Sequence, residues 1–101
     1  MTATPKALAR GLLSASSATL YTVPAATTAV ITNIVLANTS GSAVVATVVL
    51  DGVTLVPAVS IAGNSIFTAD IRQPLGTTKL VTGFAGTASV IGCHIAGSEI
   101  T

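Results

Sequence analysis

A long run of small and β-branched residues at positions 21–50 most constrains how this chain can fold. The run reads YTVPAATTAVITNIVLANTSGSAVVATVVL and contains no charged residue. Valine, isoleucine and threonine favour strands because their branched side chains pack well on a pleated surface. Asp51-Gly52 follows directly and is the strongest short signal for a two-residue hairpin with a type I′ turn. The sequence therefore predicts an all-β protein.

Turn-forming residues recur along the chain about every 8 to 12 positions, a spacing typical of antiparallel sandwiches. Pro24 and Pro57 are expected to end strands because proline has no N–H to donate to a ladder. The sequence predicts an antiparallel β-sandwich of about seven or eight short strands, with immunoglobulin-like and jelly-roll connections both open. Strands are expected at residues 18–23, 28–38, 43–50, 53–56, 65–73, 79–84 and 88–96.

The first 14 residues pattern less clearly than the rest. Residues 7–13 are compatible with a first strand or with part of an extended N-terminal arm, since Gly11 weakens the strand pattern. The 101 residues show no internal break in charge or composition, which indicates one domain. We therefore expect residues 1–14 to form an N-terminal arm or first strand, and residues 15–101 to form a single β-sandwich domain.

Alternation of apolar and polar residues assigns faces to some of these strands. On the strand at 65–73, Phe67, Ala69 and Ile71 are expected to face the core, and on the last strand Ile91, Cys93 and Ile95 are. On 28–38 and 43–50 the alternation fails and both faces are apolar. Such strands are either covered on both sides or carry an interface with another subunit. The candidate interface residues there are Ile31, Val35, Val45 and Val49.

The composition also favours association. Charged residues make up 7% of the chain, against about 25% in an average soluble domain, and the formal net charge is +1. Three aromatic residues and no tryptophan leave a core of small side chains, which release less free energy on burial than large ones. We expect much of the surface to be covered in an oligomer or a larger particle.

Catalysis is not expected. Cys93 and His94 are neighbours, but consecutive strand residues point to opposite faces and cannot form a nucleophile and base pair within one chain. No catalytic residue, cofactor or metal ligand is predicted. Four scattered basic residues offer no track for phosphates, so nucleic acid is not an expected partner. Neither a membrane-spanning stretch nor a signal peptide is expected, and a single cysteine fits synthesis in cytoplasm.

Four segments carry a family resemblance: Tyr21-Thr22-Val23-Pro24-Ala25, the turn segment Asn38-Thr39-Ser40-Gly41-Ser42-Ala43, the hairpin Val48-Val49-Leu50-Asp51-Gly52-Val53, and the ending His94-Ile95-Ala96-Gly97-Ser98-Glu99-Ile100. Together they resemble small β-sandwich virion proteins of tailed bacteriophages. The resemblance covers roughly residues 13–101. It implies a non-enzymatic structural subunit, commonly a capsid decoration or cement protein and often a homotrimer.

The function expected from this resemblance is a decoration protein on the virion capsid surface, made in the host cytoplasm, with the major capsid protein of a tailed phage and copies of itself as partners. An N-terminal arm would contact the shell or neighbouring copies through Lys6, Leu8 and Arg10. The alternative is a tail- or fibre-associated module that binds a host surface or ligand. The scarcity of aromatic anchors speaks against that alternative.

Overall fold

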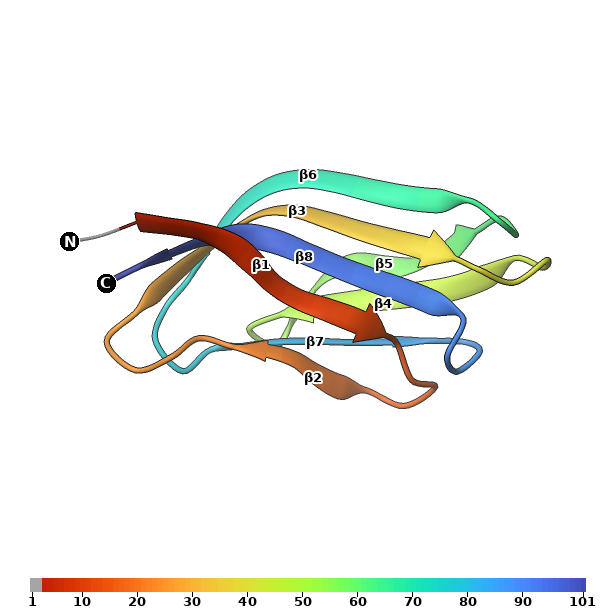
Figure 1. Cartoon of the computed structure of the whole chain (residues 1–101). Coiled ribbons are helices and arrows are strands. Elements are labelled where there is room, and N and C mark those ends of the chain that lie inside the picture. Colours follow the sequence, from red (N-terminus) through yellow and green to blue (C-terminus); the bar gives the residue numbers. More distant parts are fainter. Residues whose placement is uncertain (1–2) are drawn as a thin grey trace.

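The computed structural model describes residues 3–101, which form two four-stranded sheets packed face to face (Figure 1). The first sheet has the order β1-β8-β3-β6, and the second has the order β2-β7-β4-β5. All strand pairs are antiparallel, which confirms the predicted β-sandwich. The strands are β1 (Ala3–Leu12), β2 (Ala18–Thr22), β3 (Thr28–Asn38), β4 (Val44–Leu50), β5 (Val53–Ile61), β6 (Ile66–Leu75), β7 (Leu80–Ala85) and β8 (Ile91–Ile100).

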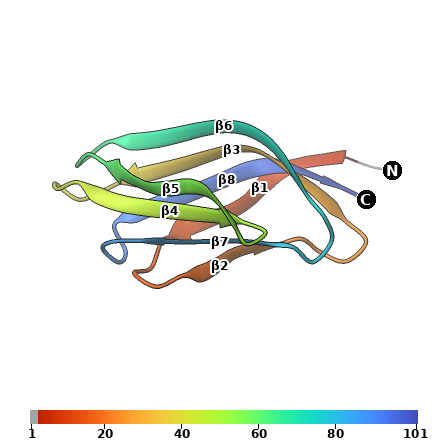
Figure 2. The same cartoon turned by 180° about the vertical axis from the view of Figure 1, so that it is seen from behind.

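The strand order decides between the immunoglobulin-like and the jelly-roll connections, which the sequence left open. Apart from the β4–β5 hairpin, each strand is followed by one in the opposite sheet, and the first and last strands lie side by side in the first sheet (Figure 1). Eight strands wound in this way form a jelly roll. The start of β1 and the end of β8 lie side by side at one end of the sandwich (Figure 1). Figure 2 shows the molecule from behind, with the second sheet nearer the viewer.

Several local predictions are confirmed. Asp51 and Gly52 have φ values of 50° and 77°, as a type I′ turn requires at both central positions. Cys93 is buried in the core and His94 is exposed on the opposite side of β8. On β6, the inward side chains pack against the core, as their alternation predicts; they are Phe67, Ala69 and Ile71.

Two strands run past prolines that could have ended them. β5 continues through Pro57, the expected end of that strand, to Ile61, and β6 continues through Pro74 to Leu75. Both are edge strands, where the missing N–H can face away from the sheet. Next to Pro57, Ala58 has a φ of 44° and the register with β4 shifts. A bulge at this edge therefore accommodates the proline without ending the strand.

The N-terminal segment is a strand, and a free arm is not confirmed. Residues 3–12 form β1, which pairs with β8 from Ala3–Ile100 to Leu12–Gly92. Leu8 points inward and belongs to the hydrophobic core. Residues 1 and 2 of the expected arm lie outside the described residues. The segment therefore completes the first sheet, and its removal would take away an edge strand and a core side chain.

A line of bulges crosses the first sheet beside Ala96 of β8. The register shifts between Ala7 and Ala9 on β1, and between Ile31 and Asn33 on β3. An extra residue reverses the alternation of a strand beyond it, so Ile31 and Ile34 both point inward and are fully buried. Ile31 therefore lies in the core and not on an outer face with Val35. The apparent failure of alternation on this strand has a bulge as its cause.

Gly97 lies where these bulges bring the strands together. A methyl group added to it would lie 2.1 Å from the carbonyl oxygen of Val30 and 3.1 Å from the Cα of Ile31. Both atoms belong to the backbone of the neighbouring strand and cannot rotate away. The close approach of β8 and β3 at this point therefore requires a residue without a side chain.

Candidate interaction surface

The outer face of the second sheet is uncharged. On its two central strands, β4 and β7, every second residue is a core residue. The residues between them point outward and do not pack against the core cluster. Their neighbours across the ladder on β2 and β5 are exposed threonine and serine. We call this surface the neutral face. Its centre consists of Val45, Thr47, Val49, Leu80, Thr82 and Phe84, and its rim of Thr19, Thr22, Thr54 and Ser60.

The large side chains of the neutral face are only partly covered. Val45 is 41% exposed and Leu80 is 40% exposed, while Val49 and Phe84 are half-buried. Thr47 lies directly opposite Phe84 in the ladder between β4 and β7 and is nearly buried by its surroundings. The centre of the face is thus an aromatic ring and branched aliphatic groups on two adjacent strands.

The outer face of the first sheet is different, because it carries charge. Arg10 of β1 and His94 of β8 are cross-strand partners, and Arg10 Nε donates a hydrogen bond to His94 Nδ1 at 3.1 Å. On β6, Asp70 accepts a hydrogen bond from Asn33 Nδ2 at 2.9 Å. This face therefore carries charged groups beside apolar side chains such as Ile66, in contrast to the neutral face.

The remaining charged residues lie at the ends of the sandwich. Lys79 and Asp51 form an exposed pair at 3.8 Å beside the β4–β5 turn. Lys6 donates to Glu99 Oε1 at 3.1 Å, and the Tyr21 hydroxyl donates to Glu99 Oε2. Tyr21 belongs to the second sheet, so this cluster joins the two sheets near the chain ends. Within residues 3–101, no charged side chain lies on the neutral face.

The Glu99 cluster makes stability depend on pH in a defined direction. Hydrogen bonds from Tyr21 and then from Lys6 hold the pKa of the Glu99 carboxyl below its usual 4.5. Burial, followed by the nearby carboxylate, raises the pKa of the Tyr21 hydroxyl above 10.0, so this group remains a donor at neutral pH. A lowered carboxyl pKa stabilises the fold above the unfolded value, and this contribution is lost as the pH falls through the folded value.

We therefore expect the wild type to lose more stability than Glu99→Gln when the pH falls below about 4.5. The glutamine side chain keeps the shape of the glutamate but does not bind a proton in this range. Urea unfolding followed by circular dichroism between about pH 7 and about pH 3 measures the difference. Identical pH dependence in the two proteins would show that the Glu99 contacts do not influence stability.

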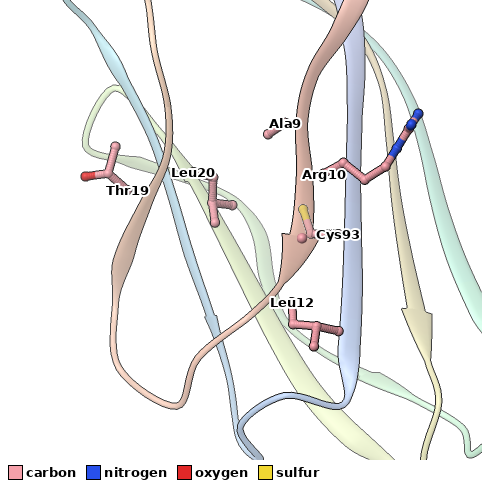
Figure 3. Close-up of a pocket in the computed structure, with 7 residues that line it drawn as sticks. Ala9, Arg10, Leu12, Thr19, Leu20 and Cys93 are labelled. Atoms are coloured by element: carbon pink, nitrogen blue, oxygen red, sulfur yellow. The ribbon is translucent and has the colours of Figure 1, made fainter.

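A small pocket lies between the edge strands β1 and β2 (Figure 3). It has a volume of about 200 Å³, and Leu12, Leu20 and Cys93 are among its lining residues. The Arg10 side chain runs away from it across β8 (Figure 3). Burial raises the pKa of the Cys93 thiol to about 11, so the thiol is protonated at neutral pH and is a poor nucleophile.

The residues predicted from the sequence as an interface fall in different places. Val45 and Val49 lie on the neutral face, Val35 lies on the outer face of the first sheet, and Ile31 and Leu8 are buried. Lys6 and Arg10 are exposed on β1 and bind Glu99 and His94. Sequence reasoning missed Leu80 and Phe84. Their alternation with Val81, Gly83 and Ala85 was the sequence signal that could have placed them on an outer face.

Comparison with protein-family models, with curated proteins and with solved structures finds no match for this chain. The structure itself defines the class as an all-β jelly-roll sandwich. Within residues 3–101, no group of three or more histidine, cysteine, aspartate or glutamate side chains is placed to hold a metal ion. The same part of the chain contains no helix long and apolar enough to cross a membrane.

Proposed function

We propose that this protein is a non-enzymatic structural subunit of a virion. In its specific form, the proposal is a capsid decoration protein that associates with copies of itself and binds the capsid lattice of a tailed phage. In this proposal the major capsid protein is its binding partner, and the protein is located on the capsid surface. The segments that resemble small phage virion proteins supply this identity, and the surface of the sandwich supports it.

The observation that carries the proposal is the contrast between the two outer faces of the sandwich. The neutral face presents Val45, Leu80 and Phe84 and no charged group, whereas the outer face of the first sheet presents charged residues together with exposed Ile66; the charged residues are Arg10, Asp70 and Arg72. A subunit built into a particle needs one surface for its neighbours and another for water. Exposed contiguous apolar surface on a small domain marks a site of association.

The fold is compatible with this role and does not specify it. Jelly rolls occur in viral capsid domains, but also in lectins and cupins. Function must therefore be argued from the surface. The surface found here consists of packing groups and not of converging polar groups around a deep pocket, which favours a structural role over ligand binding.

The copy number of this chain in purified particles tests the proposal. Quantitative mass spectrometry gives the ratio of this chain to the major capsid protein. We expect hundreds of copies in a simple ratio to the shell, as a lattice-wide decoration protein requires. A few to a dozen copies would favour the tail-associated alternative. Absence from purified particles would refute the virion assignment.

A further inference from the structure

We propose that the neutral face is covered by the neutral face of a second copy of this chain, so that two subunits pack sheet against sheet about a two-fold axis. The inference rests on the proposed self-association and specifies its surface and geometry. Three properties of the molecule support it: the distribution of charge, the arrangement of side chains on the face, and the state of the sheet edges.

The distribution of charge selects the partner. Charged groups on a partner surface would lose their hydration when they bind the neutral face, and they would find no opposite charge there. The fitting partner is uncharged and apolar at its centre. Every copy of this chain carries such a surface, whereas its opposite face carries Arg10, Asp70 and Arg72. Pairing of two neutral faces leaves both charged faces in water.

The arrangement of side chains matches that of a protein interface. Phe84 and Val45 occupy the central strands β7 and β4, and threonine and serine occupy the edge strands β2 and β5. Interfaces commonly have an apolar centre with an aromatic anchor and a polar rim that excludes water. Phe84 is the one aromatic residue among 3–101 that does not pack against the core of its own subunit.

The edges of both sheets favour contact through faces. The register shifts within β1 and β2, and also where β5 pairs with β4 and β6 with β3. Pro5, Pro57 and Pro74 also lie on edge strands. Bulges and prolines interrupt the row of backbone groups that another strand would need for pairing. Copies are therefore expected to stack their sheets and not to extend them.

The size of the neutral face sets the expected affinity. Its strands contain 5, 6, 7 and 9 residues. At about 3.3 Å per residue and about 4.8 Å between strands, the sheet measures roughly 22 by 19 Å. A pair of such faces buries on the order of 1,000 Å² of accessible surface, the lower end for specific interfaces. We expect a dimer with a micromolar dissociation constant.

The symmetry of this contact differs from the trimer that the family resemblance implies. A face that packs on its own copy makes an isologous contact, which closes at two subunits. Two sheets packed in this way lie about 10 Å apart, with their side chains interdigitated.

Sedimentation equilibrium of the purified chain, from about 1 to about 500 µM, tests the pairing without any particle. The subunit mass is 9.9 kDa, and the wild type is expected to approach twice this mass as concentration rises. Val45→Glu places a charge at the centre of the contact and is expected to weaken pairing by about 100-fold or more. Val45→Thr keeps the shape without the charge and is expected to pair.

The matched control is Val35→Glu, the same change at an outward position on a central strand of the other sheet. This variant is expected to pair like the wild type, and circular dichroism checks that all variants are folded. A wild type that remains a monomer, that forms a trimer, or that pairs regardless of Val45→Glu overturns the inference. Particle copy number is measured separately, so a monomer found at lattice-wide copy number would point to the shell as the occupant of the neutral face.

Discussion

Replacement of Gly97 with alanine is expected to lower the free energy of unfolding by more than about 4 kcal/mol, a large part of the roughly 5–15 kcal/mol by which a domain is usually stable. The added methyl group would lie 2.1 Å from the Val30 carbonyl oxygen, inside any permitted contact. The clash can be relieved only if β8 and β3 move apart. They would have to do so at the place where both neighbours of β8 carry a bulge. Chemical unfolding followed by circular dichroism, or loss of soluble expression, measures the effect.

Gly11→Ala is the matched control for this change. Gly11 also lies in a strand of the first sheet, and nothing lies within 4 Å of a methyl group added there. Its substitution is expected to change stability by less than about 1 kcal/mol. If Gly97→Ala were as stable as Gly11→Ala, the strands could not approach each other as closely as the structure shows.

Truncation of either Ile31 or Ile34 to alanine is expected to cost about 2–5 kcal/mol, the usual range for a fully buried isoleucine. Both side chains have no exposed surface, although they are three positions apart on one strand. In a regular strand they would point to opposite sides, and one of the two substitutions would be mild. Urea unfolding of the two variants measures the cost directly.

Ile66→Ala is the matched control, because it removes the same atoms from a side chain that is 65% exposed on β6. Its expected cost is below about 1 kcal/mol. A mild effect at Ile31 together with a large effect at Ile34 would place Ile31 on the surface and argue against the bulge in β3. Two large effects would support the line of bulges beside Ala96.

The candidate surface was only partly accessible from the sequence. Val45 and Val49 were candidate interface residues because both faces of their predicted strand are apolar, and the structure places them on the neutral face. Phe84 and Leu80 complete that face from β7, a strand that lies far along the chain from β4. Their contribution depends on the pairing of β7 with β4, which no local pattern encodes.

The sequence by itself determined the class of fold, the approximate positions of the strands, the type I′ turn at Asp51-Gly52 and the opposite orientations of Cys93 and His94. These features follow from local preferences: branched side chains favour strands, few residues accept positive φ, and successive strand residues alternate. Each is decided within a few neighbouring residues.

Tertiary structure alone decided the jelly-roll strand order, the burial of Ile31 and Leu8, and the placement in the first sheet of all strands that carry charged residues among 3–101. A bulge exists only relative to the strand beside it, and the partners of β8 lie far from it and from each other along the chain. The side on which a residue finally lies depends on that pairing. Long-range contacts therefore set the two faces of this protein, while local sequence set the strands that form them.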